Sequence, residues 1–303
     1  MIDFQRLSLE KKSDYDRILQ ALDNRGCEYS FVNLYLWGRQ KAAFLGDNLV
    51  FFSQFNRKSI YLFPVGPGDK KPALDAVMQD ARERGIPCRL TGLNQDDCAL
   101  LERLYPGQLR YHFDRDTFDY IYDIEALATL KGKKLQKKRN HLNRFRENNP
   151  DHTLEPITKE NIGQVKELVD QWYRLRLTQD PHKDFQLEQA AISKALEHWD
   201  DLGIEGLLLW CGGVPVAMTL GSPLNPTTFD VHFEKALDIA DGAYAAINNG
   251  FARYLMDKYP GLLWLNREDD MGLEGLRKAK LSYNPHHMQE KSWAHLLEDG
   301  YDY

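Results

Sequence analysis

Cysteine is scarce in this sequence, which contains four among its 303 residues. No two of them form a Cys-x-x-Cys pair, and their spacing matches no pattern of zinc ligands. They are Cys27, Cys88, Cys98 and Cys211. The sequence therefore gives no sign of a zinc ribbon or a dithiol centre, and it predicts small buried thiols in a reducing compartment and no metal site.

Long apolar segments are also missing. The most apolar stretch, residues 206–221, is interrupted by Gly212, Gly213 and Pro215. It predicts two core strands around a tight turn rather than a membrane-spanning helix. The N-terminal sequence Met-Ile-Asp-Phe-Gln-Arg has no apolar signal-peptide core. We therefore expect a cytoplasmic protein without a transmembrane segment.

Basic charge is not in excess, because 39 Lys and Arg residues face 45 Asp and Glu residues and leave a net charge of -6. Any binding to nucleic acid must then come from a local patch. A hydrophobic fraction of 43% is ordinary for a chain that buries a core and argues against disorder. The length favours two domains.

The two halves share one order of expected elements: helix, helix, three strands, helix, strand, helix, strand. In the first half, Gly46-Asp47-Asn48 predicts a hairpin between two of the strands. In the second half, the third strand covers 228–234 and the following helix covers 242–258. This order is that of acetyltransferase-like folds. We predict an α/β (α+β) protein with two tandem acetyltransferase-like domains and mixed sheets, residues 1–125 and 126–303.

A basic segment opens the second predicted domain. Residues 131–146 contain no acid and eight cations, which are Lys131, Lys133, Lys134, Lys137, Lys138, Arg139, Arg144 and Arg146. Leu135, Leu142 and Phe145 recur at helical spacing, so a helix here would dock by one stripe and point its cations outward. Such a helix is suited to the phosphates of RNA, a nucleotide or lipid headgroups. The alternative is a solvated helix that links the two domains.

Three ionisable residues alternate along the predicted strand at 228–234. Since side chains alternate in a strand, Asp230, His232 and Glu234 share one face. Two carboxylates and an imidazole on one surface are able to deprotonate an attacking amine. The alternative is an amphipathic strand whose polar face is wet.

Two helix starts are further candidates. Gly242 and Tyr244 begin the helix after that strand, where Asp241 is a candidate cap and exposed N–H groups suit a phosphate. However, the Gln-x-x-Gly-x-Gly cradle of coenzyme A enzymes is missing. In the second case, Arg277 and Lys280 lie three apart on a helix that follows a polar strand end. The alternative there is a salt-bridged surface helix.

Several motifs in the same order resemble one bacterial family. They are Glu28-Tyr29-Ser30-Phe31-Val32-Asn33-Leu34, Asp119-Tyr120-Ile121-Tyr122, Leu130-Lys131-Gly132-Lys133-Lys134, Lys137-Lys138-Arg139-Asn140-His141, His232-Phe233-Glu234-Lys235-Ala236, Gly242-Ala243-Tyr244, Asn266-Arg267-Glu268-Asp269-Asp270-Met271-Gly272 and Gly275-Leu276-Arg277-Lys278-Ala279-Lys280-Leu281-Ser282-Tyr283. Across nearly its whole length the chain is similar to the phosphatidylglycerol lysyltransferase C-terminal-domain family. The resemblance implies a tandem acetyltransferase-like fold. In membrane-bound relatives it also implies aminoacyl transfer from charged tRNA to a lipid headgroup, whereas the membrane portion of those relatives is absent from this sequence.

The resemblance and the residues together suggest a role for each candidate. The donor, an aminoacyl-tRNA or an acyl-coenzyme A, would be held by one set of residues, which are Lys134, Lys137, Lys138, Arg139, Gly242, Tyr244 and Arg267. Glu234 or His232 is the expected base, with Asp230 orienting it. Arg277 and Lys280 would meet negative charge, and Glu268 or Asp270 would bind the α-amino group of the donor.

No nucleophilic Ser or Cys motif is visible, so direct attack is expected on an amine or hydroxyl of a small molecule or lipid headgroup. We place this site in the second domain, between the strand with His232 and Glu234 and the helix with Arg277 and Lys280. A coenzyme A-dependent N-acyltransferase and a non-catalytic RNA- or nucleotide-binding protein remain the alternatives.

Overall fold

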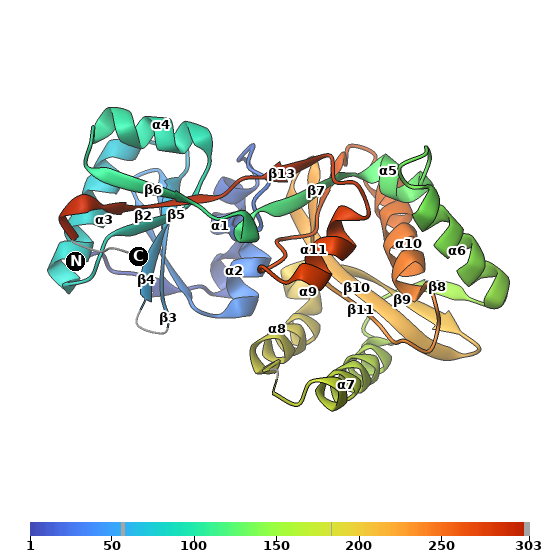
Figure 1. Cartoon of the computed structure of the whole chain (residues 1–303). Coiled ribbons are helices and arrows are strands. Elements are labelled where there is room, and N and C mark those ends of the chain that lie inside the picture. Colours follow the sequence, from blue (N-terminus) through green and yellow to red (C-terminus); the bar gives the residue numbers. More distant parts are fainter. Residues whose placement is uncertain (56–57, 183, 300–303) are drawn as a thin grey trace. The chain divides into compact units, whose positions relative to one another are not determined.

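The computed structural model describes residues 1–55, 58–182 and 184–299, and the chain forms two compact units (Figure 1). The first unit comprises Met1–Asp119, Asp269–Gly272 and Met288–Tyr303. The second comprises Tyr120–Glu268 and Leu273–His287. Within the described residues, no helix combines the length and the apolar character needed to cross a bilayer.

The first unit is built on a sheet with the strand order β1-β2-β3-β4-β5-β14-β6. Its strands are β1 (Gln5–Arg6), β2 (Gln40–Leu45), β3 (Asn48–Phe55), β4 (Lys58–Val65), β5 (Arg89–Leu93), β6 (Leu109–Phe113) and β14 (Ser292–Leu296). Its helices are α1 (Lys12–Leu19), α2 (Phe31–Trp37), α3 (Lys70–Arg84) and α4 (Gln95–Leu104), with short 3₁₀ turns at Leu9–Lys11, Cys27–Tyr29, Arg115–Thr117 and Leu297–Asp299. Among the described residues of this sheet, only the β4–β5 pairing is parallel.

Local signals explain most of these boundaries. Gly46, at φ 59°, closes the predicted β2–β3 hairpin. Asn94 and Asp97 form a reciprocal capping box at the start of α4. The apolar stripe of α3, which includes Leu74 and Val77, packs into the core with strand residues of β3, β4 and β5. The predicted order of elements in this half is thus largely confirmed.

The second unit is built on a sheet with the strand order β13-β7-β12-β11-β10-β9-β8. Its strands are β7 (Asp119–Asp123), β8 (Thr153–Pro156), β9 (Glu205–Cys211), β10 (Val214–Asn225), β11 (Thr228–Ala236), β12 (Trp264–Asn266) and β13 (His287–Gln289). Its helices are α5 (Ile124–Thr129), α6 (Gln136–Asn148), α7 (Ile162–Gln179), α8 (Gln186–Glu197), α9 (Trp199–Leu202), α10 (Ala243–Lys258) and α11 (Glu274–Leu281). The predicted mixed α/β class is confirmed.

The domain boundaries differ from the expected division into 1–125 and 126–303. Strand β7 pairs with β12 in the second sheet, whereas β14 pairs with β5 and β6 in the first. Each half of the chain therefore supplies a strand to the other sheet. Local sequence gives the strand character of both segments, but the choice of partner depends on distant residues.

The second sheet opens at one point. Strands β11 and β12 pair in parallel up to Asp230 and Asn266, where β12 ends, while β11 continues to Ala236. Within the described part of the chain, the residues of β11 beyond Asp230 therefore lack a neighbouring strand on that side. The segment that leaves β12 passes next to this gap, because its residues Arg267 and Glu268 lie against Glu234 and His232 of β11.

Candidate functional site

Strand β11 carries the three predicted ionisable residues at the opening of the second sheet. Asp230 and His232 are buried, and Glu234 is largely covered. The expected alternative, a polar face in contact with water, is therefore wrong. Gly221 on β10 lets the neighbouring backbone come close, because a Cβ there would lie 2.3 Å from the carbonyl oxygen of Asp230.

His232 is the centre of a buried hydrogen-bonded network. Its Nε2 lies 2.8 Å from Ser222 Oγ, and its Nδ1 lies 3.4 Å from Glu268 Oε1 and 3.5 Å from Asp230 Oδ2. Ionised carboxylates only accept hydrogen bonds, so a tautomer with its proton on Nδ1 would suit both carboxylates and would leave Nε2 to accept from the Ser222 hydroxyl. The network connects β10, β11 and the segment after β12.

The same cluster has the composition of a cation site. The ligand atoms of Asp230, His232 and Glu268 all lie within 4.8 Å of one another. An imidazole with two carboxylates suits a divalent metal ion, provided that Nδ1 loses its proton. This grouping could not be predicted from local spacing, because Glu268 lies 36 residues from His232 and approaches it only in the folded chain.

Glu234 forms a largely buried ion pair with Arg267. Its Oε1 lies 2.9 Å from Arg267 Nη2, and the two side chains are 10% and 12% exposed. Its Oε2 accepts a hydrogen bond from Asn248 Nδ2 at 3.4 Å. Burial alone would lower the pKa of Arg267, but Glu234 and neighbouring tyrosines raise it. Arg267 also faces the rings of Tyr122 and Tyr283, with centroids 5.6 Å and 5.1 Å from its Cζ.

Lys280 has a different position from the one expected. Its buried Nζ donates to the carbonyl oxygens of Arg267, at 2.5 Å, and Glu268, at 3.2 Å. The ammonium therefore holds the backbone of the segment after β12 instead of meeting a ligand. Arg277 is half-buried on α11, and the ion pair with Glu234 is formed by Arg267 rather than by Arg277.

The segment after β12 is held in an unusual conformation. Glu268 has φ 56°, in the left-handed region, and its N–H donates to Asn266 Oδ1 at 2.6 Å. Such conformations persist where the surrounding structure enforces them, often at functional sites. Asp270, the predicted alternative to Glu268, is buried in the first unit, where it accepts from Arg115 Nη1 at 3.3 Å. Glu268 therefore belongs to the second-unit cluster and Asp270 does not.

Part of the basic segment is helical, and some of its cations have partners on the chain. Helix α6 begins at Gln136, so Lys131, Lys133 and Lys134 precede it and are exposed, and Lys137 is exposed on the helix. The predicted stripe is confirmed, since Leu135, Leu142 and Phe145 are buried. The remaining arginines have partners on the chain: Arg139 donates to the carbonyl oxygen of Leu130, Arg144 lies 3.9 Å from Asp241, and Arg146 lies 3.5 Å from Asn249.

Lys138 connects the basic segment to Arg267, since both side chains lie against the ring of Tyr283. Its Nζ lies 3.9 Å from the centroid of the Tyr283 ring, which Arg267 also faces. Burial and the nearby cations Arg267 and Lys137 lower the pKa of Lys138 to about 8. Lys138 is therefore distinct from the freely solvated lysines around it.

The start of α10 is explained by packing. Gly242 has φ 88°, and a Cβ there would lie 2.9 Å from Phe145 Cβ and 3.1 Å from the carbonyl oxygen of His141. The glycine thus permits close contact with α6, and Asp241 makes no side-chain cap. Tyr244 is exposed in the first turn. Sequence reasoning missed Ser222 and Asn248, whose positions follow from strand register and helix packing, and it gave Tyr283 no role.

Comparison with known proteins places this geometry in a family. The family model described as phosphatidylglycerol lysyltransferase, C-terminal, matches residues 19–295. A conserved protein of unknown function from Bacteroides thetaiotaomicron has 39% sequence identity and a TM-score of 0.93, over 98% of this chain and 100% of that chain. L-PGS from Bacillus licheniformis has 17% identity and a TM-score of 0.70, over 96% and 92%. A tandem GNAT protein from the clavulanic acid biosynthesis pathway has 10% identity and a TM-score of 0.51 over 100% of both chains, a likeness of fold that confirms the predicted tandem acetyltransferase-like architecture.

Proposed function

The chain belongs to the phosphatidylglycerol lysyltransferase C-terminal family, and we propose that it transfers an aminoacyl group from charged tRNA to an amine or hydroxyl acceptor. The observation that carries the proposal is the Glu234–Arg267 ion pair at the opening between β11 and β12. It places a proton acceptor beside a donor of hydrogen bonds in a largely dry environment, as acyl transfer requires.

Arg267 supplies the electrophilic side of this reaction. Its Nη2 is used by Glu234, but its Nη1 is buried and has no hydrogen-bond partner among the described residues. A buried donor without an acceptor is costly, and the carbonyl oxygen of a bound aminoacyl ester would satisfy it. As negative charge grows on that oxygen, the guanidinium would stabilise it.

Glu234 supplies the base in this proposal. The acceptor nitrogen or oxygen forms a bond to the ester carbonyl carbon, its proton passes to Glu234, and the bond from that carbon to the tRNA ribose oxygen breaks. The ribose oxygen leaves with the proton from Glu234, so no covalent enzyme intermediate is formed. His232 is too deeply buried to meet the acceptor, and it positions Glu268, which we assign to the α-amino group of the donor.

The exposed lysines of the basic segment would hold the tRNA phosphates. We expect replacement of Lys133, Lys134 and Lys137 by Ala to weaken tRNA binding and to make it less dependent on salt. The slope of the logarithm of the binding constant against the logarithm of the salt concentration should become shallower by about 0.7 to 0.9 for each phosphate that the variant no longer neutralises. Binding measured from low to moderate salt gives this slope. A matched triple variant of exposed lysines elsewhere in the second unit, Lys159, Lys166 and Lys278, should keep it; equal slopes in both variants would remove the segment from the site.

The lowered pKa of Lys138 should be visible in the pH dependence of the free energy of unfolding. Its pKa of about 8 lies below the ordinary value of 10.5, so above pH 8 the unfolded chain holds a proton that the folded chain has released. Stability then rises with pH between about 8 and 10, by up to about 1.4 kcal/mol per unit. Urea unfolding of the native protein and Lys138→Met at several pH values measures the difference, and parallel curves would contradict this environment.

Neither the coenzyme A-dependent N-acyltransferase nor the non-catalytic RNA- or nucleotide-binding protein is favoured by a specific observation. Gly242 packs against α6, which accounts for the glycine at the start of α10 without a coenzyme A phosphate. The direct experiment incubates the protein with tRNA charged with mixed amino acids and a panel of amines and lipid headgroups. Mass spectrometry should find an aminoacylated acceptor that forms only with charged tRNA. Binding of tRNA without any product would favour the non-catalytic alternative.

A further inference from the structure

The carboxylate of Glu234 has a second neighbour that the proposed reaction does not use. Asn248 lies on α10 and is 4% exposed, and its Nδ2 donates to Glu234 Oε2 at 3.4 Å. An ionised carboxylate only accepts hydrogen bonds, so the NH₂ group of the amide has to face Glu234. The Oδ1 atom of Asn248 therefore lies on the other branch of the same amide group, next to the carboxylate.

This amide oxygen is buried and has no hydrogen-bond partner among the described residues. An acceptor in that position is costly unless a ligand donates to it. The next residue of α10 gives the contrast, because Asn249 is equally buried but its amide is in use. Its Nδ2 donates to the carbonyl oxygens of Leu127 and Ala128, each at 2.8 Å. Its Oδ1 lies 3.5 Å from Arg146 Nη2. Contacts within the protein therefore explain Asn249 but leave the oxygen of Asn248 without a role.

Two buried atoms of opposite character thus lie beside one carboxylate. In the part of the chain that the structure describes, Arg267 Nη1 is a hydrogen-bond donor without a partner and Asn248 Oδ1 is an acceptor without one. Glu234 contacts both residues, with Oε1 toward Arg267 and Oε2 toward Asn248. The donor suits the carbonyl oxygen of the ester, as proposed above, so the acceptor is left for the attacking group.

The side of α10 that carries Asn248 reaches solvent at Tyr244. The two residues are four apart on the helix, so their side chains lie on the same side. The Tyr244 side chain is exposed. Burial raises the pKa of its hydroxyl and the nearby Glu234 acts in the same direction, so this hydroxyl lies close to the carboxylate. A molecule that enters past Tyr244 would meet Glu234 and Asn248 together.

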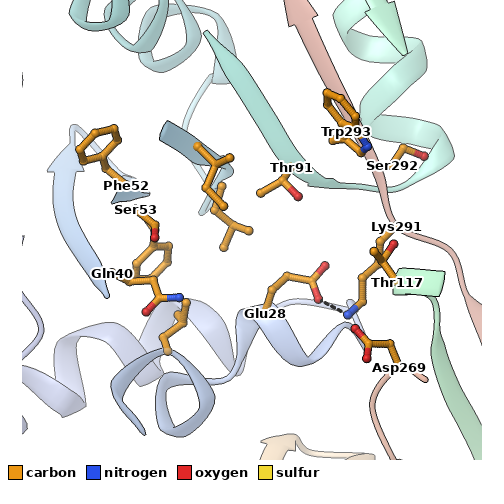
Figure 2. Close-up of a pocket in the computed structure, with 14 residues that line it drawn as sticks. Glu28, Gln40, Phe52, Ser53, Thr91, Thr117, Asp269, Lys291, Ser292 and Trp293 are labelled. Carbon is orange, nitrogen blue, oxygen red and sulfur yellow. Dashed lines mark ion pairs between the residues drawn. The ribbon is translucent and has the colours of Figure 1, made fainter. Parts of the chain in front are cut away.

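A buried carboxylate of the first unit has different surroundings. Glu28 lines a cavity of about 250 Å³, and Figure 2 shows Lys291 beside it. Lys291 Nζ lies 2.8 Å from Glu28 Oε2 and 2.6 Å from Asp119 Oδ1, so two carboxylates share this ammonium. Lys291 is the one cation among the described residues of the lining. A cation that two carboxylates already hold is poorly placed to meet an ester carbonyl oxygen, so we assign the attacking group to Glu234 and not to Glu28.

We propose that the acyl acceptor is a primary amine and that Asn248 selects it, an inference that rests on the transfer reaction proposed above. A neutral primary amine has two N–H groups, so it donates one to Glu234 and the other to Asn248 Oδ1 while its lone pair points at the ester carbon. The N–C bond forms, the bond from that carbon to the ribose oxygen breaks, and one proton passes through Glu234 to the ribose oxygen. The second N–H stays on the amide product and keeps its hydrogen bond to Asn248.

An alcohol and a neutral secondary amine cannot make both contacts. Each has a single donor on the attacking atom, which Glu234 requires, so Asn248 Oδ1 stays without a partner in the transition state. Sites built to hydrogen-bond an NH or OH group reject analogues that lack it. The expected selectivity therefore depends on the number of protons on the attacking atom and not on the rest of the acceptor molecule.

Single-turnover transfer from charged tRNA to propylamine, N-methylpropylamine and propan-1-ol tests this selectivity. Each rate is divided by the rate without protein, which removes differences in intrinsic reactivity. In the native protein, the acceleration for propylamine should exceed that for the other two by at least about tenfold. Asn248→Leu, which keeps the branched shape without the acceptor oxygen, should remove the preference over N-methylpropylamine. Equal accelerations in the native protein, or an unchanged preference in the folded variant, would overturn the inference.

Thermal unfolding gives a second readout that needs no substrate. Asn248→Leu should keep the native Tm or raise it, because it removes a buried acceptor that has no partner, whereas Asn249→Leu should lower the Tm because it breaks two hydrogen bonds to carbonyl oxygens. A Tm that falls as far in Asn248→Leu as in Asn249→Leu would show that Oδ1 has a partner within the protein and would overturn the inference.

The comparison of the three acceptors in the native protein depends on neither variant, and it separates two kinds of failure. Transfer from charged tRNA without a preference for propylamine would contradict the role of Asn248 alone. Native protein that leaves the charged tRNA intact with all three acceptors would contradict the transfer reaction itself, and the inference with it.

Discussion

Arg267→Met is expected to destabilise the protein by about 3 to 5 kcal/mol and to abolish transfer. The substitution leaves Glu234 largely buried and without its cationic partner, and an uncompensated buried charge costs about this much. It also removes the Nη1 donor that we assign to the ester carbonyl oxygen. Urea unfolding at pH 7 measures the stability, and transfer is measured at a temperature where the variant is folded.

A double-mutant cycle tests whether this loss of stability comes from the unpaired charge of Glu234. Glu234→Gln combined with Arg267→Met should recover part of the stability, because no buried charge is then left unpaired. The control Arg174→Met, at an exposed arginine of the same unit, should change stability little. A decrease below about 1 kcal/mol in Arg267→Met would show that the pair behaves like a solvent-exposed one.

Glu234→Gln is expected to lower turnover about 100-fold, measured at a temperature where the variant is folded, because this variant also leaves a buried charge, that of Arg267, without its partner. The amide keeps the shape of the side chain, but it cannot accept the proton of the acceptor, and a positioned base is typically worth about this factor. A 100-fold decrease corresponds to about 2.7 kcal/mol of transition-state stabilisation. Single-turnover rates with charged tRNA separate this effect from binding.

An exposed carboxylate of the same unit provides the control for that variant. Glu167→Gln on α7 should transfer at the native rate, since Glu167 is exposed and outside the cluster. If Glu234 is the base, tRNA affinity should be unchanged in Glu234→Gln while the rate of the chemical step falls. A native rate in Glu234→Gln would remove this residue from the reaction.

Features that depend on local spacing were predictable from the sequence. The alternation along β11 gave Asp230, His232 and Glu234 as one group, and the helical spacing of Leu142 and Phe145 gave the buried side of α6. Both periodicities are fixed by backbone geometry and do not depend on the rest of the fold.

Features that depend on strand pairing were not predictable. Ser222 meets His232 because β10 and β11 pair with a particular register, which no local pattern reveals. Lys280 looked free on its helix, yet it binds two backbone carbonyl groups that only the tertiary fold brings to it. In the first unit, Glu28 and Lys291 likewise form an ion pair although they come from opposite ends of the chain, because β14 enters the first sheet.

The most direct test of the proposed transfer reaction follows a labelled amino acid from the aminoacyl donor to the acceptor. Native protein is given the same labelled amino acid in two forms, esterified to tRNA or as a coenzyme A thioester, with the acceptor found by mass spectrometry. We predict that label passes from the tRNA ester to the acceptor, and that Glu234→Gln and Arg267→Met greatly slow this passage. Transfer from the coenzyme A thioester alone, or equal rates in the native protein and Glu234→Gln, would contradict the account.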